Sequence, residues 1–218
     1  MKSKVNIMKK IILILLFFSF TAFSVSAQQT KTPDELTNKQ WEDLFTALEN
    51  ENWDTAFDLS TKYLKQLNDS DEAKSIGNLR YICLYSAAGK VSAGKMTYEK
   101  LGEFVKDFVG KKLVFPFRQI SAKCGSGLNF ICFSDGVKNK ALVAAANQAG
   151  TSILAFEYLQ LKVDFDYTKY DGKEAAAAGI AKSIVPNPNK STIVILRIYI
   201  SDGSIMLRDE IEKKTDKK

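Results

Sequence analysis

The spacing of apolar residues changes near residue 110, and this change most constrains the fold of the chain. Before it, apolar side chains recur three and four positions apart, as in amphipathic helices; after it they mostly alternate, as in strands. Gly110 can end a helix, and Leu113–Phe117 is a strand-like run in which Pro116 marks an edge or a bulge. The sequence therefore predicts an α+β chain with a domain junction at Gly110.

The first 27 residues have the features of an export signal. Lysines precede an apolar run from Ile11 to Phe23, and Val25–Ala27 is a small-residue cleavage site. The uninterrupted apolar stretch is shorter than the roughly 20 residues of a membrane span. We expect cleavage before Gln28, with Met1 or Met8 as the start. The mature chain would then be periplasmic or secreted and have no stable membrane anchor.

Removing the signal changes the charge. The whole chain has 31 Lys+Arg and 25 Asp+Glu, and the signal holds four of the lysines. The high isoelectric point is therefore poor evidence for nucleic-acid binding. Residues 28–110 carry 10 basic and 14 acidic side chains, whereas residues 111–218 carry 17 and 11. This asymmetry either holds the halves together, gives the second half an anionic ligand, or reflects two solvated surfaces.

Four helices are predicted between residues 37 and 109. Thr37 or Asn38 can cap the first helix, and Asp69 or Ser70 the third. Apolar residues at helical spacing mark the four segments, and they include Trp41, Leu44, Phe45, Leu48, Trp53, Ala56, Phe57, Tyr63, Leu64, Ile76, Leu79, Ile82, Leu101, Phe104 and Phe108.

Two of these segments share a pattern. Trp41 and Leu44 precede Asn52–Phe57, an aromatic-acid-x-Ala segment, and Gly94–Leu101 is similar to it. Residues 37–108 therefore resemble tetratricopeptide-type helical hairpins. The resemblance implies a helical scaffold with a concave face for a protein partner. A plain four-helix bundle is the alternative.

The second half is predicted to be mostly strands. Residues 153–163 permit either strand or helix. Residues 174–185 contain four consecutive alanines, which favour helix, but we assign them to a strand because the strong strand at 192–200 needs a neighbour. We expect Asp202 and Gly203 to end that strand and the tail to fray. The other strand-like segments are 113–120, 128–133, 141–147, 163–167 and 204–207.

Glycine-led segments suggest a fold for this half. Gly110–Phe115 and Gly179–Ile184 resemble strands of small barrels of the oligonucleotide/oligosaccharide-binding type. The resemblance implies a mostly antiparallel barrel of five to six strands that binds ligands on one sheet face and in adjacent loops. The predicted organisation is a cleaved signal (1–27), a polar leader (28–36), a helical domain (37–109), a β-barrel-like domain (110–207) and a charged tail (208–218).

Cysteines and acids offer little chemistry. Cys124 and Cys132 flank a Gly-Ser-Gly turn, which either brings them together as a disulfide or leaves both in the core. The chain has no histidine, which removes His-assisted nucleophiles and nearly all common zinc sites. Asp164 and Asp166 share a predicted strand face near Asp171, but without a glycine-bearing calcium loop they are better explained as solvated. We predict no cofactor and no metal.

Seven residues of the second half are the candidates for ligand binding. They are Lys111, Lys112, Phe117, Arg118, Lys123, Arg197 and Tyr199. Arg118 and Arg197 each interrupt an apolar strand, so each must face water, a partner or an acid. A salt bridge to the acidic helical half is the interpretation we prefer.

The leading hypothesis is an exported, non-enzymatic binding protein that acts through protein contacts. The alternative is a binder of an anionic polymer, either polysaccharide or nucleic acid, through the basic second half. A carboxylate-dependent enzyme is third. An exposed apolar groove, a continuous basic and aromatic face, and a pocket with two close carboxylates would support these three hypotheses, respectively.

Overall fold

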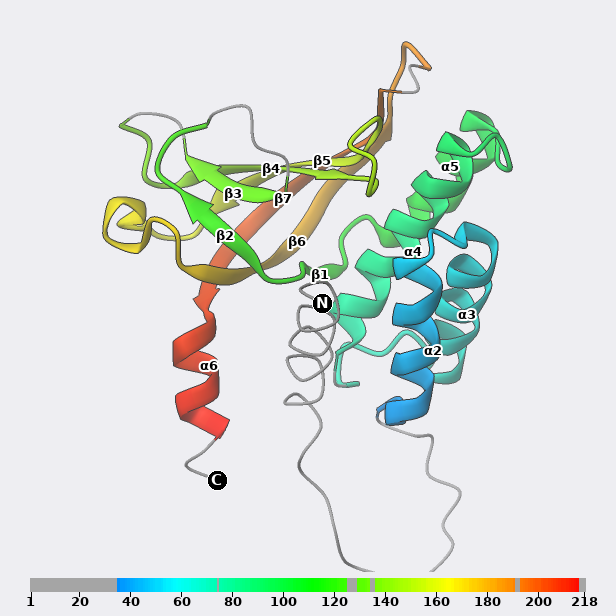
Figure 1. Cartoon of the computed structure of the whole chain (residues 1–218), viewed down its shortest axis with the longest axis horizontal. Helices are drawn as coiled ribbons and strands as arrows, with labels where there is room; N and C mark the ends of the chain where they lie inside the picture. The colour runs from blue at the N-terminus through cyan, green and yellow to red at the C-terminus, as the bar shows by residue number, and fades with distance from the viewer. Residues whose placement is uncertain (1–34, 74, 125–128, 134–135, 191–192, 216–218) are drawn as a thin grey trace, which may run out of the picture.

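The computed structural model describes residues 35–73, 75–124, 129–133, 136–190 and 193–215. Helices are followed by a mixed sheet, so the predicted α+β class is confirmed. Figure 1 shows helices α2 to α5 gathered beside the sheet, whereas α6 extends away from it. The predicted signal and nearly all of the predicted leader lie outside the described residues.

The four helices predicted between residues 37 and 109 are confirmed. They are α2 (Asn38–Glu49), α3 (Trp53–Gln66), α4 (Ile76–Ser92) and α5 (Tyr98–Phe104), and the 3₁₀-helix η1 (Val105–Phe108) follows.

The ends of these helices test the predicted caps. Thr37 caps α2: its hydroxyl accepts from the Gln40 N–H, and the Gln40 side chain accepts from the Thr37 N–H. The predicted cap of α4 at Asp69 or Ser70 is wrong, because α4 begins after Ser75 and Asp69 binds Arg80 instead. Gly110, with a φ of 84°, follows η1 at the predicted junction.

Helix α4 is the central element of the molecule. It is buried on nearly every side, and its sequence is apolar around most of its circumference, as expected of an enclosed helix. The larger hydrophobic cluster contains Leu84 of α4 and Leu101 of α5 together with Ile131 and Ile198 of the sheet. A smaller cluster packs α2 and α3 against α4. Helices α4 and α5 therefore share the larger cluster with the sheet, and α2 packs on α4 through the smaller one.

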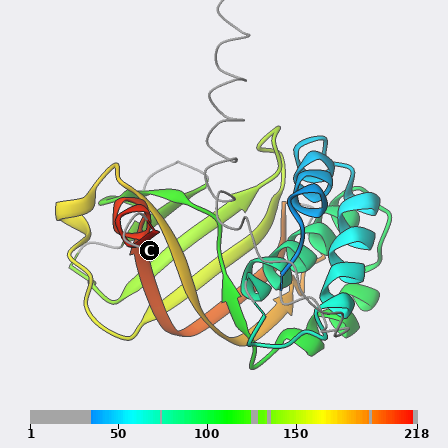
Figure 2. The same cartoon turned by 90° about the horizontal axis from the view of Figure 1, so that it is seen from below.

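The sheet has seven strands among the described residues. They are β1 (Lys112–Val114), β2 (Arg118–Ser121), β3 (Phe130–Phe133), β4 (Lys140–Ala146), β5 (Ile153–Leu161), β6 (Glu174–Pro186) and β7 (Val194–Leu207). Their order is β1-β6-β2-β3-β4-β5-β7, and β6 also pairs with β7. The pairs β2–β3 and β5–β7 are parallel, and the others are antiparallel. The ladder thus returns to β6, and Figure 2 shows the sheet curling accordingly.

Two ambiguous segments are strands, and one predicted strand end is wrong. Residues 153–161 form β5, and the alanine-rich segment forms β6 with its four alanines buried. Strand β7 continues past Asp202 to Leu207, because a bulge at Asp202 and Gly203 keeps it paired with β6.

Two further predictions are wrong. Residues 163–167 form no strand: Phe165 and Tyr167 instead stack on Phe133, and the 3₁₀-helix η2 (Tyr167–Tyr170) begins there. The tail does not fray from residue 208, because Arg208–Thr215 forms helix α6. Arg208 pairs with Glu174 of β6, which ties α6 to the sheet.

The structure decides between the two alternatives for the cysteines of the second half. Cys124 and Cys132 form a disulfide, with their Cα atoms 5.0 Å apart. The strands that precede and follow the Gly-Ser-Gly segment, β2 and β3, run parallel and so do not form a hairpin. The Gly-Ser-Gly segment lies outside the described residues.

Two helical glycines provide a test of the packing. A Cβ atom at Gly89 of α4 would lie 2.2 Å from the Trp53 ring, whereas one at Gly102 of α5 would meet only Pro186, at 3.7 Å. We predict that Gly89→Ala lowers the free energy of unfolding by about 1–3 kcal/mol, because overpacking outweighs the gain in helix propensity. Gly102→Ala should be neutral or stabilising. Urea unfolding measures both, and a Gly89→Ala variant as stable as the wild type would contradict the packing of α4 on α3.

Candidate functional site

Arg118, the most conspicuous candidate from the sequence, belongs to a buried network. Its Nη1 donates to Glu157 Oε2 at 3.2 Å, and its Nη2 donates to the Tyr81 hydroxyl at 2.9 Å. The Tyr81 hydroxyl donates to Glu157 Oε1 at 2.8 Å, which closes the triangle. Arg118 is 8% exposed and Glu157 is fully buried. Arg118 is therefore not available to a ligand at the surface.

Burial dominates the electrostatics of this network. It raises the pKa of Glu157 and of Tyr81 above their ordinary values, although Arg118 opposes the shift of both groups. Burial by itself would lower the pKa of Arg118, but the Glu157 charge and the Tyr81 hydroxyl outweigh it and raise that pKa. Arg118 therefore stays cationic in the core.

The predicted salt bridge of Arg118 has a different partner. The prediction of an acid from the helical half is wrong, because the acid is Glu157 of β5. The helical half contributes the Tyr81 hydroxyl of α4 instead. Side chains along a strand point alternately to its two faces. Glu157 is buried, whereas its neighbours Phe156 and Tyr158 are partly exposed, so Glu157 faces the core below α4.

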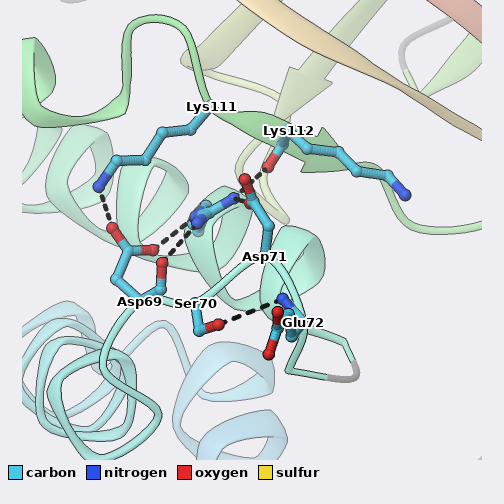
Figure 3. Close-up of polar contacts among 7 residues, drawn as sticks. Asp69, Ser70, Asp71, Glu72, Lys111 and Lys112 are labelled. Atoms are coloured by element: carbon cyan, nitrogen blue, oxygen red, sulfur yellow. Dashed lines mark hydrogen bonds and ion pairs between the residues drawn. The ribbon is translucent and has the colours of Figure 1, made fainter.

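A second buried arginine, Arg80 of α4, belongs to a network that includes the candidate residue Lys111 (Figure 3). Arg80, 1% exposed, donates to Asp69 Oδ1 and Asp71 Oδ1, both at 2.5 Å, and to the Lys112 carbonyl at 3.2 Å. Lys111 pairs with the other carboxylate oxygen of Asp69. This network joins the segment between α3 and α4 to β1. Within it, Asp69 is the ion-pair partner of Lys111. Arg80 and Lys111 together carry two positive charges, which balance the carboxylates of Asp69 and Asp71.

Among the other candidates, Phe117 and Lys123 lie apart. The Arg208 guanidinium lies over the Phe117 ring at 4.4 Å. Lys123 is exposed beside the disulfide, and its carbonyl accepts from the Ser121 hydroxyl. Lys112 is also exposed, at the β1 edge. The structure does not gather the seven candidates into one site.

Arg197 and Tyr199 lie on the outward-facing side of the sheet. Tyr199 of β7 stacks on Tyr158 of β5, with ring centroids 4.7 Å apart and planes 6° apart. Phe156 tilts against Tyr158 at 5.1 Å and is the register partner of Arg197. Since strand side chains alternate, these four residues face away from the buried Glu157.

Residues of β4 and β6 extend this surface, which we name the outer sheet face. In register, Leu142 and Ala144 lie beside the β5 aromatics, and Val185 lies beside Arg197. All are partly exposed, and Val185 is 41% exposed. The outer sheet face consists of Leu142, Ala144, Phe156, Tyr158, Val185, Arg197 and Tyr199. Arg197 is the one charged residue among these seven.

The sequence interpretation missed Phe156 and Tyr158. Because residues 153–163 permitted helix or strand, these two rings could not be assigned to the same face as Arg197 and Tyr199. The alternation of residues 156, 158 and 160 with the buried positions between them was the signal that could have found them.

The acids singled out in the sequence form no site. Asp164 and Asp166 lie outside any strand, so they share no strand face. Asp166 accepts from the Thr168 hydroxyl, and Asp171 accepts from the Ala122 N–H. The described residues contain no group of three or more His, Cys, Asp or Glu residues that could hold a metal ion. They also contain no helix with the length and apolar character needed to span a bilayer.

Comparison with known proteins adds no relative. No protein-family model matches the chain, and neither curated proteins nor solved structures give a match. The resemblances to tetratricopeptide-type hairpins and to small ligand-binding barrels stay predictions.

The buried network makes a prediction about stability. Glu157→Leu should lower the free energy of unfolding by about 3–5 kcal/mol, because it leaves the Arg118 charge buried without a counter-ion. Adding Arg118→Met should recover much of that loss, since the unpaired charge is then gone. Urea unfolding of the double-mutant cycle measures this coupling.

The control for this cycle is the exposed Glu103–Lys106 pair. Neutralising either residue should change the free energy of unfolding by no more than about 0.5 kcal/mol. Additive losses in the Arg118 and Glu157 cycle would contradict the buried pairing.

Proposed function

We propose that this protein is a non-enzymatic binding protein that contacts a protein partner through the outer sheet face. The observation that carries the proposal is the partly exposed aromatic group Phe156, Tyr158 and Tyr199 around Arg197. Aromatic residues and arginine are enriched in protein interfaces, whereas lysine is depleted there. Tyrosine and arginine are also frequent among the residues that dominate binding energy.

The charges of the second half favour a protein partner over an anionic polymer. Polymer binding draws its affinity from several basic groups that neutralise the polymer. Lys111 pairs with Asp69, and Arg118 is buried with Glu157, so neither presents a free charge. Arg197 is the one charged residue among the seven of the outer sheet face, and Lys140 extends the same side of β4 beyond Leu142. Binding of polysaccharide or nucleic acid is therefore the weaker proposal.

Carboxylate-dependent catalysis has less support than binding. Glu157 has the perturbed pKa expected of a catalytic acid, but it is fully buried beneath α4 and bonded to Arg118 and Tyr81. Asp69 and Asp71 lie close together but are bonded to Arg80. A substrate would have to displace these partners to reach either acid.

The finer description of the fold and the location are also proposals. The return of the strand ladder to β6 supports a small closed barrel. The succession of α2 with α3 and of α4 with α5 along the chain is the basis for proposing two repeat-like hairpins. The Cys124–Cys132 disulfide suits an oxidising compartment, which supports export.

Site-specific photocrosslinking tests the binding proposal. A photoreactive phenylalanine analogue at position 158 should capture a discrete protein from the native host. The captured protein, once purified, should bind the wild-type chain, and Arg197→Ala or Tyr199→Ala should weaken that binding about tenfold or more, as expected for residues that dominate an interface. The matched control places the analogue at Lys169, which is exposed on η2.

Two results would overturn the proposal. One is equal capture from positions 158 and 169, followed by binding that is insensitive to the Arg197 and Tyr199 changes. The other is binding to heparin or single-stranded DNA that weakens linearly with the logarithm of salt concentration and is lost in Arg197→Ala, which would favour the polymer.

A further inference from the structure

A shallow cleft that shares no residue with the outer sheet face lies where β1, β6 and β7 meet the residue that follows β5. Its volume is about 380 Å³. Its lining residues are Lys112, Lys162, Ala178, Gly179, Ile180, Asp202 and Ser204. We name it the Lys112–Lys162 cleft.

A β-bulge forms one side of this cleft. Ala178 pairs with Ser204 and Ile180 with Ser201, so β7 has one more residue than β6 across this interval. Asp202 accommodates the bulge with a φ of 53°, which residues other than glycine seldom adopt. Bulges recur beside functional sites, where they redirect a side chain. Here the bulge places Asp202 and Ser204 along the cleft.

Gly179 lines the cleft, and its surroundings leave no room for a side chain. A Cβ atom there would lie 2.7 Å from the Ser201 carbonyl oxygen. A Cβ atom at Gly203, within the bulge, would lie 2.9 Å from the Gln160 carbonyl oxygen. The two glycines therefore permit the close approach of β5, β6 and β7 that shapes the cleft.

Two lysines from different elements supply the charge. Lys112 and Lys162 are exposed, and neither has an ion-pair partner in the described part of the chain. Their backbones are fixed, because the Lys112 carbonyl accepts from Arg80 and the Lys162 N–H donates to the Gly203 carbonyl. Figure 3 shows the Lys112 side chain running away from Lys111 and the Asp69 network. Its amine is thus free of that network.

We propose that the Lys112–Lys162 cleft binds a tetrahedral oxyanion, either phosphate or sulfate. The two amines supply charged donors, and the Ser204 hydroxyl supplies a neutral one. Asp202 is the one acidic residue that lines the cleft, so the net charge of the lining is +1. Its carboxylate opposes the anion, which makes the affinity sensitive to that residue. This site does not depend on the protein partner proposed above.

Backbone amide NMR of the full chain tests the proposal. Inorganic phosphate and sulfate, added at constant ionic strength with chloride as the balancing anion, should shift the Gly179, Gly203 and Ser204 amides saturably. Lys112→Gln and Lys162→Gln should each weaken the apparent affinity about tenfold, because each removes a charged hydrogen bond. Asp202→Asn should strengthen it.

Lys182→Gln is the matched control, since Lys182 is exposed on β6 but does not line the cleft. It should leave the affinity unchanged. Linear shifts that never saturate, or an equal loss in Lys182→Gln, would overturn the proposal. Glucose 6-phosphate distinguishes the two sources of the anion: tighter binding than inorganic phosphate indicates an esterified ligand, and equal binding indicates the free ion.

Discussion

The buried ion pair between Arg118 and Glu157, closed by the Tyr81 hydroxyl, is the polar interaction that constrains how helix α4 sits on the sheet. It ties α4 to β2 and β5, two strands that are not neighbours in the sheet. Burying two charges costs free energy that only a well-formed pair offsets, so an arrangement that separated Arg118 from Glu157 would leave a buried charge unpaired. The shared hydrophobic core is built around that arrangement.

Ion pairs within the molecule use several of the basic side chains that could otherwise bind a ligand. Arg118 and Lys111 are candidates for ligand binding in the sequence, yet both serve contacts within the molecule, and Arg80 joins α4 to β1 as well. With these charges paired, the available surfaces are the mostly uncharged outer sheet face and the basic Lys112–Lys162 cleft. The first suits a protein partner and the second a small anion, and the two can act independently.

Local patterns predicted the helices well, because caps and apolar spacing act within a few residues, as at Thr37. They also placed β6 correctly once its neighbour was considered. Contacts between distant residues escaped prediction: Arg118 and Glu157 are 39 positions apart, and their pairing depends on a sheet order with parallel β2–β3 and β5–β7 pairs. Helix α6 was missed because its sequence is highly charged, and the contact of Arg208 with Glu174 that ties it to β6 joins residues far apart in the chain.

Native-state hydrogen exchange is the most direct test of the central claim that α4 and the sheet are one structural unit. The amides of α4 near Tyr81 and those of β5 near Glu157 should open with the same free energy, and Glu157→Leu should lower both equally. If α4 opened at a much lower free energy than β5, or if Glu157→Leu affected β5 alone, the helices and the sheet would be separate units and the account would be contradicted.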